Sequence, residues 1–88
     1  MKIRFTSKFE KQVSKVNSPK LKQDILSIIQ QAENAGSVHE LKNLKKLIGY
    51  KSHFRIRLGD YRIGLFLDND ILEFAAFDNR KDIYKYFP

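Results

Sequence analysis

The second half of the chain alternates between apolar and polar residues, which is the pattern of short half-buried strands. Residues 53–58 alternate in this way, and Gly59-Asp60 supplies a two-residue turn before the next alternating segment. Residues 61–67 and 71–77 repeat the pattern on either side of the turn sequence Asp68-Asn69-Asp70. These segments predict a three-stranded antiparallel meander.

The first half of the chain has helical spacing. Residues 2–5 alternate and predict a short first strand, and Ser7 with Glu10 fits a capping box at the start of a helix. Ser18 suits an N-cap and Pro19 the first position of a second helix, which is expected to stop near Gly36. The apolar stripes of the two helices are Phe9, Val13 and Val16, followed by Leu21, Ile25, Ile28, Ile29 and Ala32.

The segment 37–49 fits neither period well, because Leu41, Leu44 and Leu47 recur at every third position. We expect a connecting loop with one helical turn. The predicted fold is α+β: an N-terminal strand, an antiparallel helical hairpin and the meander in one sheet, with the helices packed on one face. With 88 residues and no linker or repeat, residues 1–88 are expected to form a single domain.

The Gly59-Asp60 turn fixes a register between the first two meander strands, in which Arg57 lies opposite Arg62 and Arg55 opposite Gly64. The turn at Asn69-Asp70 predicts the pairs Leu67 with Leu72, Leu65 with Phe74 and Ile63 with Ala76. One face then carries the apolar core. The other carries Arg55, Arg57 and Arg62 beside Gly64, Phe66 and Ala75, with a shallow trough between arginine walls.

Two guanidinium groups placed directly opposite each other destabilise a sheet by about 0.2–1 kcal/mol. Because the sequence nevertheless places two arginines here, we expect an anion to be held between the two guanidinium groups, and phosphate is the obvious candidate. Solvated surface arginines are the simpler alternative.

Charge supports an anionic partner. The chain has a formal net charge of +7 and a pI near 9.8, and residues 37–67, which include the arginine hairpin, carry a net +5. There is no cysteine and only two histidines, so neither disulfides, a metal site nor a cofactor is expected. No apolar run resembles a signal peptide or a membrane span, and we expect a soluble cytoplasmic protein.

Four phrases of the sequence resemble those of the RelE/ParE superfamily of toxin–antitoxin toxins, in that family's order and spacing. They are Leu41-Lys-Asn-Leu44, Leu47-Ile-Gly49, Phe54-Arg-Ile-Arg-Leu-Gly-Asp-Tyr-Arg-Ile63 and Arg80-Lys-Asp-Ile-Tyr84. The resemblance covers essentially the whole chain. It implies a toxin that is held inactive by a cognate antitoxin.

In the RelE branch, the resemblance implies cleavage of messenger RNA in the A site of the 30S ribosomal subunit. The 2′-hydroxyl attacks the neighbouring phosphate and leaves a 2′,3′-cyclic product. By position, the family's basic strand residues match Arg55, Arg57 and Arg62, and its tail residues match Arg80 and Tyr84. Further RNA contacts are expected from a diffuse basic footprint: Lys42, Lys45, Lys46, Lys51 and His53.

One position departs from the family pattern, because Asp78 stands where many relatives carry a histidine or an arginine. A carboxylate cannot supply positive charge to a transition state, although it can pair with Arg80. Two alternatives therefore stay open. One is a ParE-like poison of DNA gyrase without RNase activity, and the other is an antitoxin-binding relic with little activity.

Overall fold

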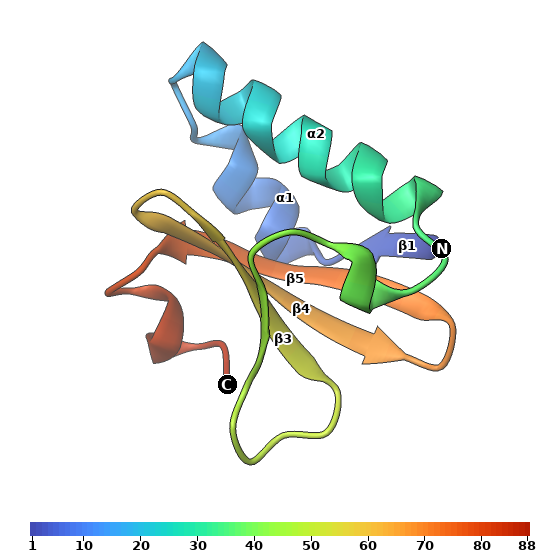
Figure 1. Ribbon diagram of the computed structural model, residues 1–88. Coiled ribbons are helices and arrows are strands. Elements are labelled where there is room, and N and C mark those ends of the chain that lie inside the picture. The colour runs from blue at the N-terminus through green and yellow to red at the C-terminus, as the bar shows by residue number, and fades with distance from the viewer.

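The chain folds into one sheet with both helices on one face and the C-terminal segment on the other, as the computed structural model shows for all 88 residues (Figure 1). The elements are β1 (Lys2–Phe5), α1 (Ser7–Ser14), α2 (Pro19–Asn34), the 3-10 turn η1 (Val38–Glu40), β2 (Leu44–Lys46), β3 (His53–Leu58), β4 (Tyr61–Asp68), β5 (Ile71–Asn79) and the 3-10 turn η2 (Ile83–Lys85). The strand order is β1-β5-β4-β3-β2, with β1 parallel to β5 and every other pair antiparallel. This confirms the predicted α+β architecture.

The segment between the helices and the meander contains a strand that the sequence did not predict. The expected helical turn is η1, but Leu44, Lys45 and Lys46 form the edge strand β2 against β3. Asn43 precedes it with a φ of 61°, and Leu41 is buried. The segment with a leucine at every third position therefore contains a 3-10 turn, a residue with left-handed backbone conformation and a strand. This explains why neither the helical nor the strand period fits it.

The predicted register of the first hairpin is confirmed. Arg57 pairs with Arg62 and Arg55 with Gly64 across β3 and β4, and Gly59 in the turn has a φ of 60°. Positive φ costs little without a Cβ, so glycine makes this two-residue turn accessible.

The register of the second hairpin is only partly as predicted. Leu67 pairs with Leu72 and Leu65 with Phe74, but Ile63 pairs with Phe77 instead of Ala76. A β-bulge lies at Gly64/Leu65, and Ala75 on β5 is the extra residue. The bulge reverses the side-chain parity of β5 beyond it, so that Phe77 faces the helices and Ala76 the opposite side.

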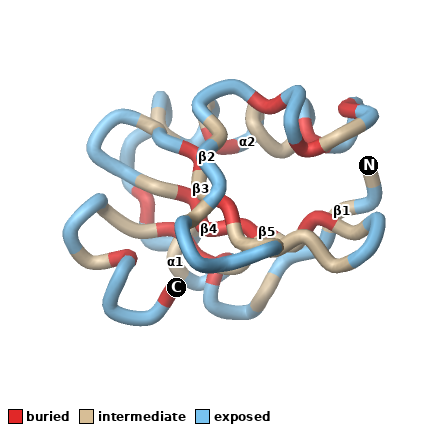
Figure 2. Tube along the Cα trace, turned by 60° about the horizontal axis from the view of Figure 1, so that its bottom comes forward, coloured by how far each residue is buried: buried red, intermediate tan, exposed pale blue.

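The main core lies between the helices and the sheet, where buried residues of both layers face each other (Figure 2). Ile25 and Ala32 of α2 and Phe9 of α1 contribute from the helical layer, as their spacing predicted. A second, smaller cluster lies on the other face and consists of Ala76, Ile83 and Phe87. The C-terminal segment is thus packed against the sheet. No helix is both long enough and apolar enough to span a bilayer.

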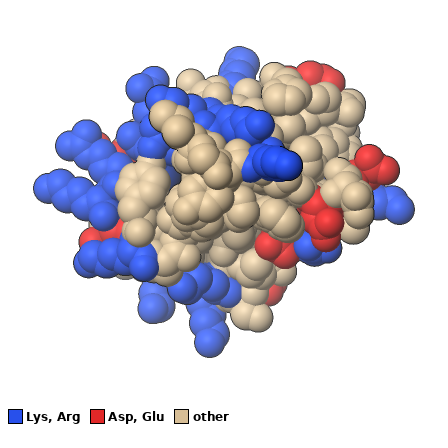
Figure 3. Space-filling view, turned by 90° about the horizontal axis from the view of Figure 1, so that it is seen from below, with Lys and Arg blue, Asp and Glu red and all other residues tan.

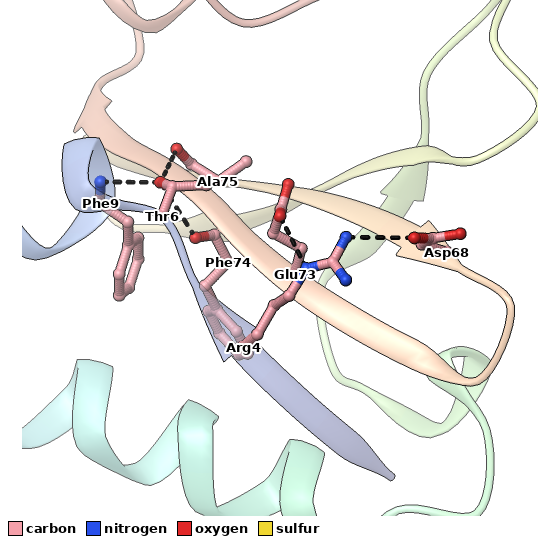
Figure 4. A network of polar contacts seen from close by, with 7 residues as sticks. All are labelled: Arg4, Thr6, Phe9, Asp68, Glu73, Phe74 and Ala75. Carbon is pink, nitrogen blue, oxygen red and sulfur yellow. Dashed lines mark hydrogen bonds and ion pairs between the residues drawn. The ribbon is translucent and has the colours of Figure 1, made fainter.

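Charge is unevenly distributed over the surface. In the view from below, Lys and Arg gather mainly on one side and most of the Asp and Glu atoms on the other (Figure 3). Some of the acidic residues form ion pairs: Asp68 and Glu73 bind Arg4 at 3.2 and 2.8 Å (Figure 4).

The helix starts are set by side-chain caps. Ser18 accepts a hydrogen bond from the Leu21 backbone N–H at 3.2 Å, as predicted for α2. The predicted cap of α1 was wrong by one residue, because the Thr6 hydroxyl accepts from the Phe9 N–H at 3.0 Å and Ser7 is already helical (Figure 4). The same hydroxyl donates to the Ala75 carbonyl at 2.7 Å. Thr6 thus caps α1 and also satisfies the carbonyl of the bulged residue of β5.

Candidate functional site

Three arginines share the sheet face opposite the helices. Arg57 and Arg62 lie directly across from each other on β3 and β4, and Arg55 lies two residues before Arg57 on the same side of β3. Arg80 joins them from the C-terminal segment, because its backbone N–H donates to the Asp60 carbonyl in the β3–β4 turn at 2.8 Å. We call Arg55, Arg57, Arg62 and Arg80 the arginine cluster.

Arg62 shows the electrostatic effect of this arrangement. Its guanidinium donates to the carbonyls of Gly59 and Tyr61, both at 2.8 Å, which hold it at the turn end of the hairpin. Burial lowers the pKa of Arg62, and repulsion from the other three arginines of the cluster lowers it further. An arginine keeps its proton at neutral pH in any case, so the cluster concentrates four positive charges.

None of these four arginines forms an ion pair with a carboxylate. Arg4, on the same sheet, instead binds two carboxylates, and these hydrogen bonds raise its pKa (Figure 4). Arg55 and Arg57 lie within residues 41–59, which contain six basic side chains and no acidic one. Asp78 lies opposite Arg62, but its carboxylate is bonded to the Tyr86 hydroxyl. The arginine cluster is therefore available for an external anion.

Asn79 directs the C-terminal segment back over the sheet. Its side-chain oxygen accepts from the backbone N–H groups of Lys81 and Asp82 at 2.9 Å each, and its amide donates to the Asp82 carboxylate at 2.8 Å. This last bond and Lys85 lower the pKa of Asp82. The resulting turn brings Tyr84 to the arginine cluster, where its hydroxyl accepts a hydrogen bond from Arg55. Tyr84 remains 46% exposed.

The trough predicted beside the arginines is filled. Phe87 is only 6% exposed and lies over Gly64, where a Cβ would stand 2.7 Å from two carbons of its ring. Gly64 thus provides the space for this aromatic ring, and the cluster of Ala76, Ile83 and Phe87 occupies the middle of the face. An anion can reach the arginines at the margin of this cluster and not at its centre.

Asp78 has a partner that the sequence did not reveal. The bulge places it opposite Arg62 on β4, yet its carboxylate accepts from the Tyr86 hydroxyl at 2.6 Å and from the Asn79 N–H at 2.8 Å. Gln12 of α1 donates to the same hydroxyl and accepts from the Phe77 N–H at 2.8 Å. Asp78 forms no ion pair with Arg80, although a carboxylate at this position could do so.

Tyr86 connects the C-terminal segment to α1 through these contacts. Burial raises its pKa above the usual 10.0, and the hydrogen bond to Asp78 raises it further. Lys8 lies over its ring, 3.8 Å from the centroid. Sequence analysis missed Gln12, Tyr86 and Phe87 as residues that organise the site, because each acts through a contact between distant segments.

The remaining predicted residues do not all lie on this face. Lys45 pairs with Arg55 and shares its side of the sheet, whereas Lys46 pairs with Phe54 and by parity belongs to the helical side. Lys42 lines a surface hollow of about 530 Å³ beside α2. Lys51 is exposed in the β2–β3 loop.

His53 begins β3 on the arginine side and lies among aromatic rings. No group of three or more His, Cys, Asp or Glu side chains could hold a metal ion. The hollow beside α2 contains no arginine, whereas Arg57 and Lys42 both line a smaller surface hollow of about 300 Å³.

No protein-family profile matches the chain. The chain is 38% identical over 89 residues to Toxin RelE3 of Methanocaldococcus jannaschii, and the match covers 100% of both sequences. Among solved structures, it resembles the RelB–RelE antitoxin–toxin complex from Methanococcus jannaschii, with a TM-score of 0.79 and 36% identity. That match covers 96% of this chain and 98% of the other.

A second archaeal RelE–RelB complex, from Pyrococcus horikoshii, matches with a TM-score of 0.74 and 18% identity. It covers 92% of this chain and 96% of the other, and at this identity it supports the fold alone. The full-length match to Toxin RelE3, together with the arrangement of sheet, helices and arginines, shows that this chain belongs to the RelE family of toxins from toxin–antitoxin systems.

Proposed function

We propose that this toxin cleaves messenger RNA in the ribosomal A site. The observation that carries the proposal is the arginine cluster, in which four guanidinium groups lie together without a carboxylate partner. In the reaction, the 2′-oxygen forms a bond to phosphorus and the bond to the 5′-oxygen breaks. The products are a 2′,3′-cyclic phosphate and a 5′-hydroxyl end.

In this proposal Arg55, Arg57 and Arg62 stabilise the negative charge that develops on the phosphate oxygens. Guanidinium groups suit this role because they donate two parallel hydrogen bonds to phosphate oxygens and need no reorganisation when charge develops. Arginine is a poor proton acceptor at neutral pH, so these residues act electrostatically and not as the base for the 2′-hydroxyl. Arg80 adds charge from the C-terminal segment.

Tyr84 is proposed to act at the leaving 5′-oxygen. Its hydroxyl accepts a hydrogen bond from Arg55, so its own hydrogen remains free to be donated. Its exposure leaves room for a nucleotide beside it. A Tyr84→Phe variant should therefore lose rate while keeping the stacking surface of the ring.

The partner is proposed to be a RelB-type antitoxin, as in the archaeal antitoxin–toxin complexes that the chain resembles. A net charge of +7 favours an acidic segment laid over the basic face. Such a segment would neutralise the arginine cluster and exclude RNA from it.

Primer extension on translating ribosomes tests the proposed activity. Arg62→Ala should slow cleavage about 100-fold or more, because one preformed charge at the transition state is lost. The matched control is Arg4→Ala, which removes an arginine from the same sheet outside the cluster and should leave cleavage unchanged. The neighbouring lysines give a second comparison: Lys45→Ala should reduce cleavage and Lys46→Ala should not. An unchanged cut with Arg62→Ala, or no cut with the wild-type protein, would overturn the assignment.

One observation favours a second candidate. Asp78 places a carboxylate opposite Arg62, where the family pattern has a basic residue, and this favours a gyrase poison without RNase activity. Gyrase-dependent DNA breakage in a supercoiling assay, with messenger RNA intact, would support that candidate. If expression without antitoxin neither cleaves RNA nor affects gyrase or growth, the protein is an antitoxin-binding relic.

A further inference from the structure

An aromatic cluster lies beside the arginines on the same sheet face. His53 is half-buried, and its ring centroid lies 5.1 Å from that of Tyr50, 4.9 Å from Phe66 and 5.7 Å from Phe87. The His53 side chain makes no hydrogen bond with the protein, so ring contacts alone hold it. Tyr50 is 45% exposed and forms the outer surface of this cluster.

The aromatic cluster is aligned with the arginine cluster along β3. His53, Arg55 and Arg57 alternate on one side of this strand, and the rise of about 3.3 Å per residue separates His53 from Arg55 by roughly 7 Å. The path from exposed rings to unpaired guanidinium groups is therefore short enough for adjacent nucleotides. Phe87 belongs to the aromatic cluster and also covers Gly64, which makes the surface continuous.

The charges around Tyr50 determine which partner suits these rings. Lys51 follows Tyr50 in the β2–β3 loop, and Lys45 lies across from Arg55. No acidic residue occurs between positions 41 and 59. Exposed aromatic rings beside a line of positive charge are the combination that binds single-stranded nucleic acid, in which bases stack and the backbone is neutralised.

We infer that Tyr50 and His53 form a stacking site for a nucleobase next to the phosphate held by the arginine cluster. The inference deepens the proposed function and rests on its RNA substrate. Tyr50 supplies the ring surface, and His53, fixed by Phe66 and Phe87, orients Tyr50. Stacking of this kind tolerates any base, so it positions the RNA without reading its sequence.

Binding of a short single-stranded RNA tests the inference without requiring cleavage. The probe is a fluorescently labelled 2′-O-methyl RNA, which lacks the attacking hydroxyl, and the readout is anisotropy at low salt. Tyr50→Ala should weaken binding about 5- to 150-fold, the range for loss of one stacked base, and Tyr50→Phe should bind like the wild type. The control Leu26→Ala removes an exposed apolar side chain from α2, on the far layer, and should change nothing.

A set of RNAs with a single abasic nucleotide at each position gives the base-specific readout. An RNA that is abasic at the stacked position has no base to contact Tyr50. Wild type and Tyr50→Ala should therefore bind this RNA equally. Equal binding of the intact RNA by both proteins overturns the inference, as does undetectable binding by the wild type. If Tyr50→Ala weakens only the complex with a co-expressed RelB-type antitoxin, the loop is a protein contact and the inference is also wrong.

The two proposals fail separately. Cleavage by the wild type together with RNA binding that is insensitive to Tyr50 removes the stacking site and leaves the RNase. Tyr50-dependent RNA binding without cleavage on ribosomes removes the RNase and leaves the stacking site.

Discussion

The contact between Gly64 and Phe87 gives a sharp test of how the C-terminal segment is held on the sheet. Gly64→Ala adds a methyl group that would stand 2.7 Å from two ring carbons of Phe87, and no real Cβ contact is so short. Either the strand or the ring must move. Forcing an extra methyl into a packed site costs about 1–3 kcal/mol, and expelling Phe87 costs about 1.5–3 kcal/mol, the value of burying its side chain.

The sign of the effect should reverse once Phe87 is removed. In a Phe87→Ala background the new Cβ at position 64 has space, and alanine in a strand interior is better than glycine by about 0.5–1 kcal/mol. The coupling free energy between the two positions should therefore be about 2 kcal/mol or more. Such a value is well above the usual non-additivity of distant sites, about 0.3–0.5 kcal/mol.

Urea denaturation of the wild type, both single variants and the double variant measures this coupling. Circular dichroism in the far ultraviolet reports the unfolding, and equal m-values confirm that the unfolding transition stays comparable. Additive free energies of unfolding would refute the reasoning, because they would mean that the Phe87 ring does not rest on Gly64.

Two further predictions concern the contacts that fix the segments around the arginine cluster. Thr6→Ala should lower the free energy of unfolding by about 1–2 kcal/mol, because it removes both the α1 cap and the hydrogen bond to the Ala75 carbonyl. The control Ser7→Ala should lower it by less than about 0.5 kcal/mol in the same urea measurement. Tyr86→Phe should destabilise the protein at pH 7 by about 1 kcal/mol, because Asp78 loses its hydroxyl donor. Since the pKa of Tyr86 is raised in the folded state, the unfolded chain releases the phenol proton first, and this stabilisation is lost as the pH rises above about 10. The difference between wild type and Tyr86→Phe should therefore shrink from pH 9 to 11, and a constant difference would contradict the raised pKa.

The arginine pair could be predicted from sequence because local signals determine it. Gly59 permits the positive φ of a two-residue turn, and such a turn fixes the register of both strands that it joins. Parity then places Arg55, Arg57 and Arg62 on one face. The core face of β3 followed from the same alternation, since Phe54 and Ile56 are buried.

The C-terminal segment could not be placed in the same way. The position of Phe87 depends on a glycine 23 positions earlier in the chain, and no local pattern indicates that contact. The alternation pattern predicts an open trough beside Gly64, whereas the Phe87 ring fills this space. A small residue in a strand indicates close approach, and the sequence does not say whether a ligand or the chain itself approaches.

The spacing of two phenylalanines in β5 is a sequence signal for the bulge. Phe74 and Phe77 are both large and apolar, and both are buried in the main core, although they lie three positions apart in the sequence. A regular strand would place them on opposite faces, so two core residues at this spacing require an extra residue between them. An extra residue at this point places Ala76 and Asp78 on the arginine face, as the structure shows.

The position of Asp78 is therefore determined by a contact far from the candidate site. Thr6 donates to the carbonyl of Ala75, the extra residue, across 69 positions of sequence, and so stabilises the bulge that turns Asp78 towards Arg62 and Tyr86. A basic side chain at position 78 would add to the arginine cluster, whereas the aspartate binds Tyr86 and ties the C-terminal segment to α1 through Gln12. The departure from the family pattern thus exchanges one positive charge at the candidate site for a contact that holds the segment carrying Tyr84 in place.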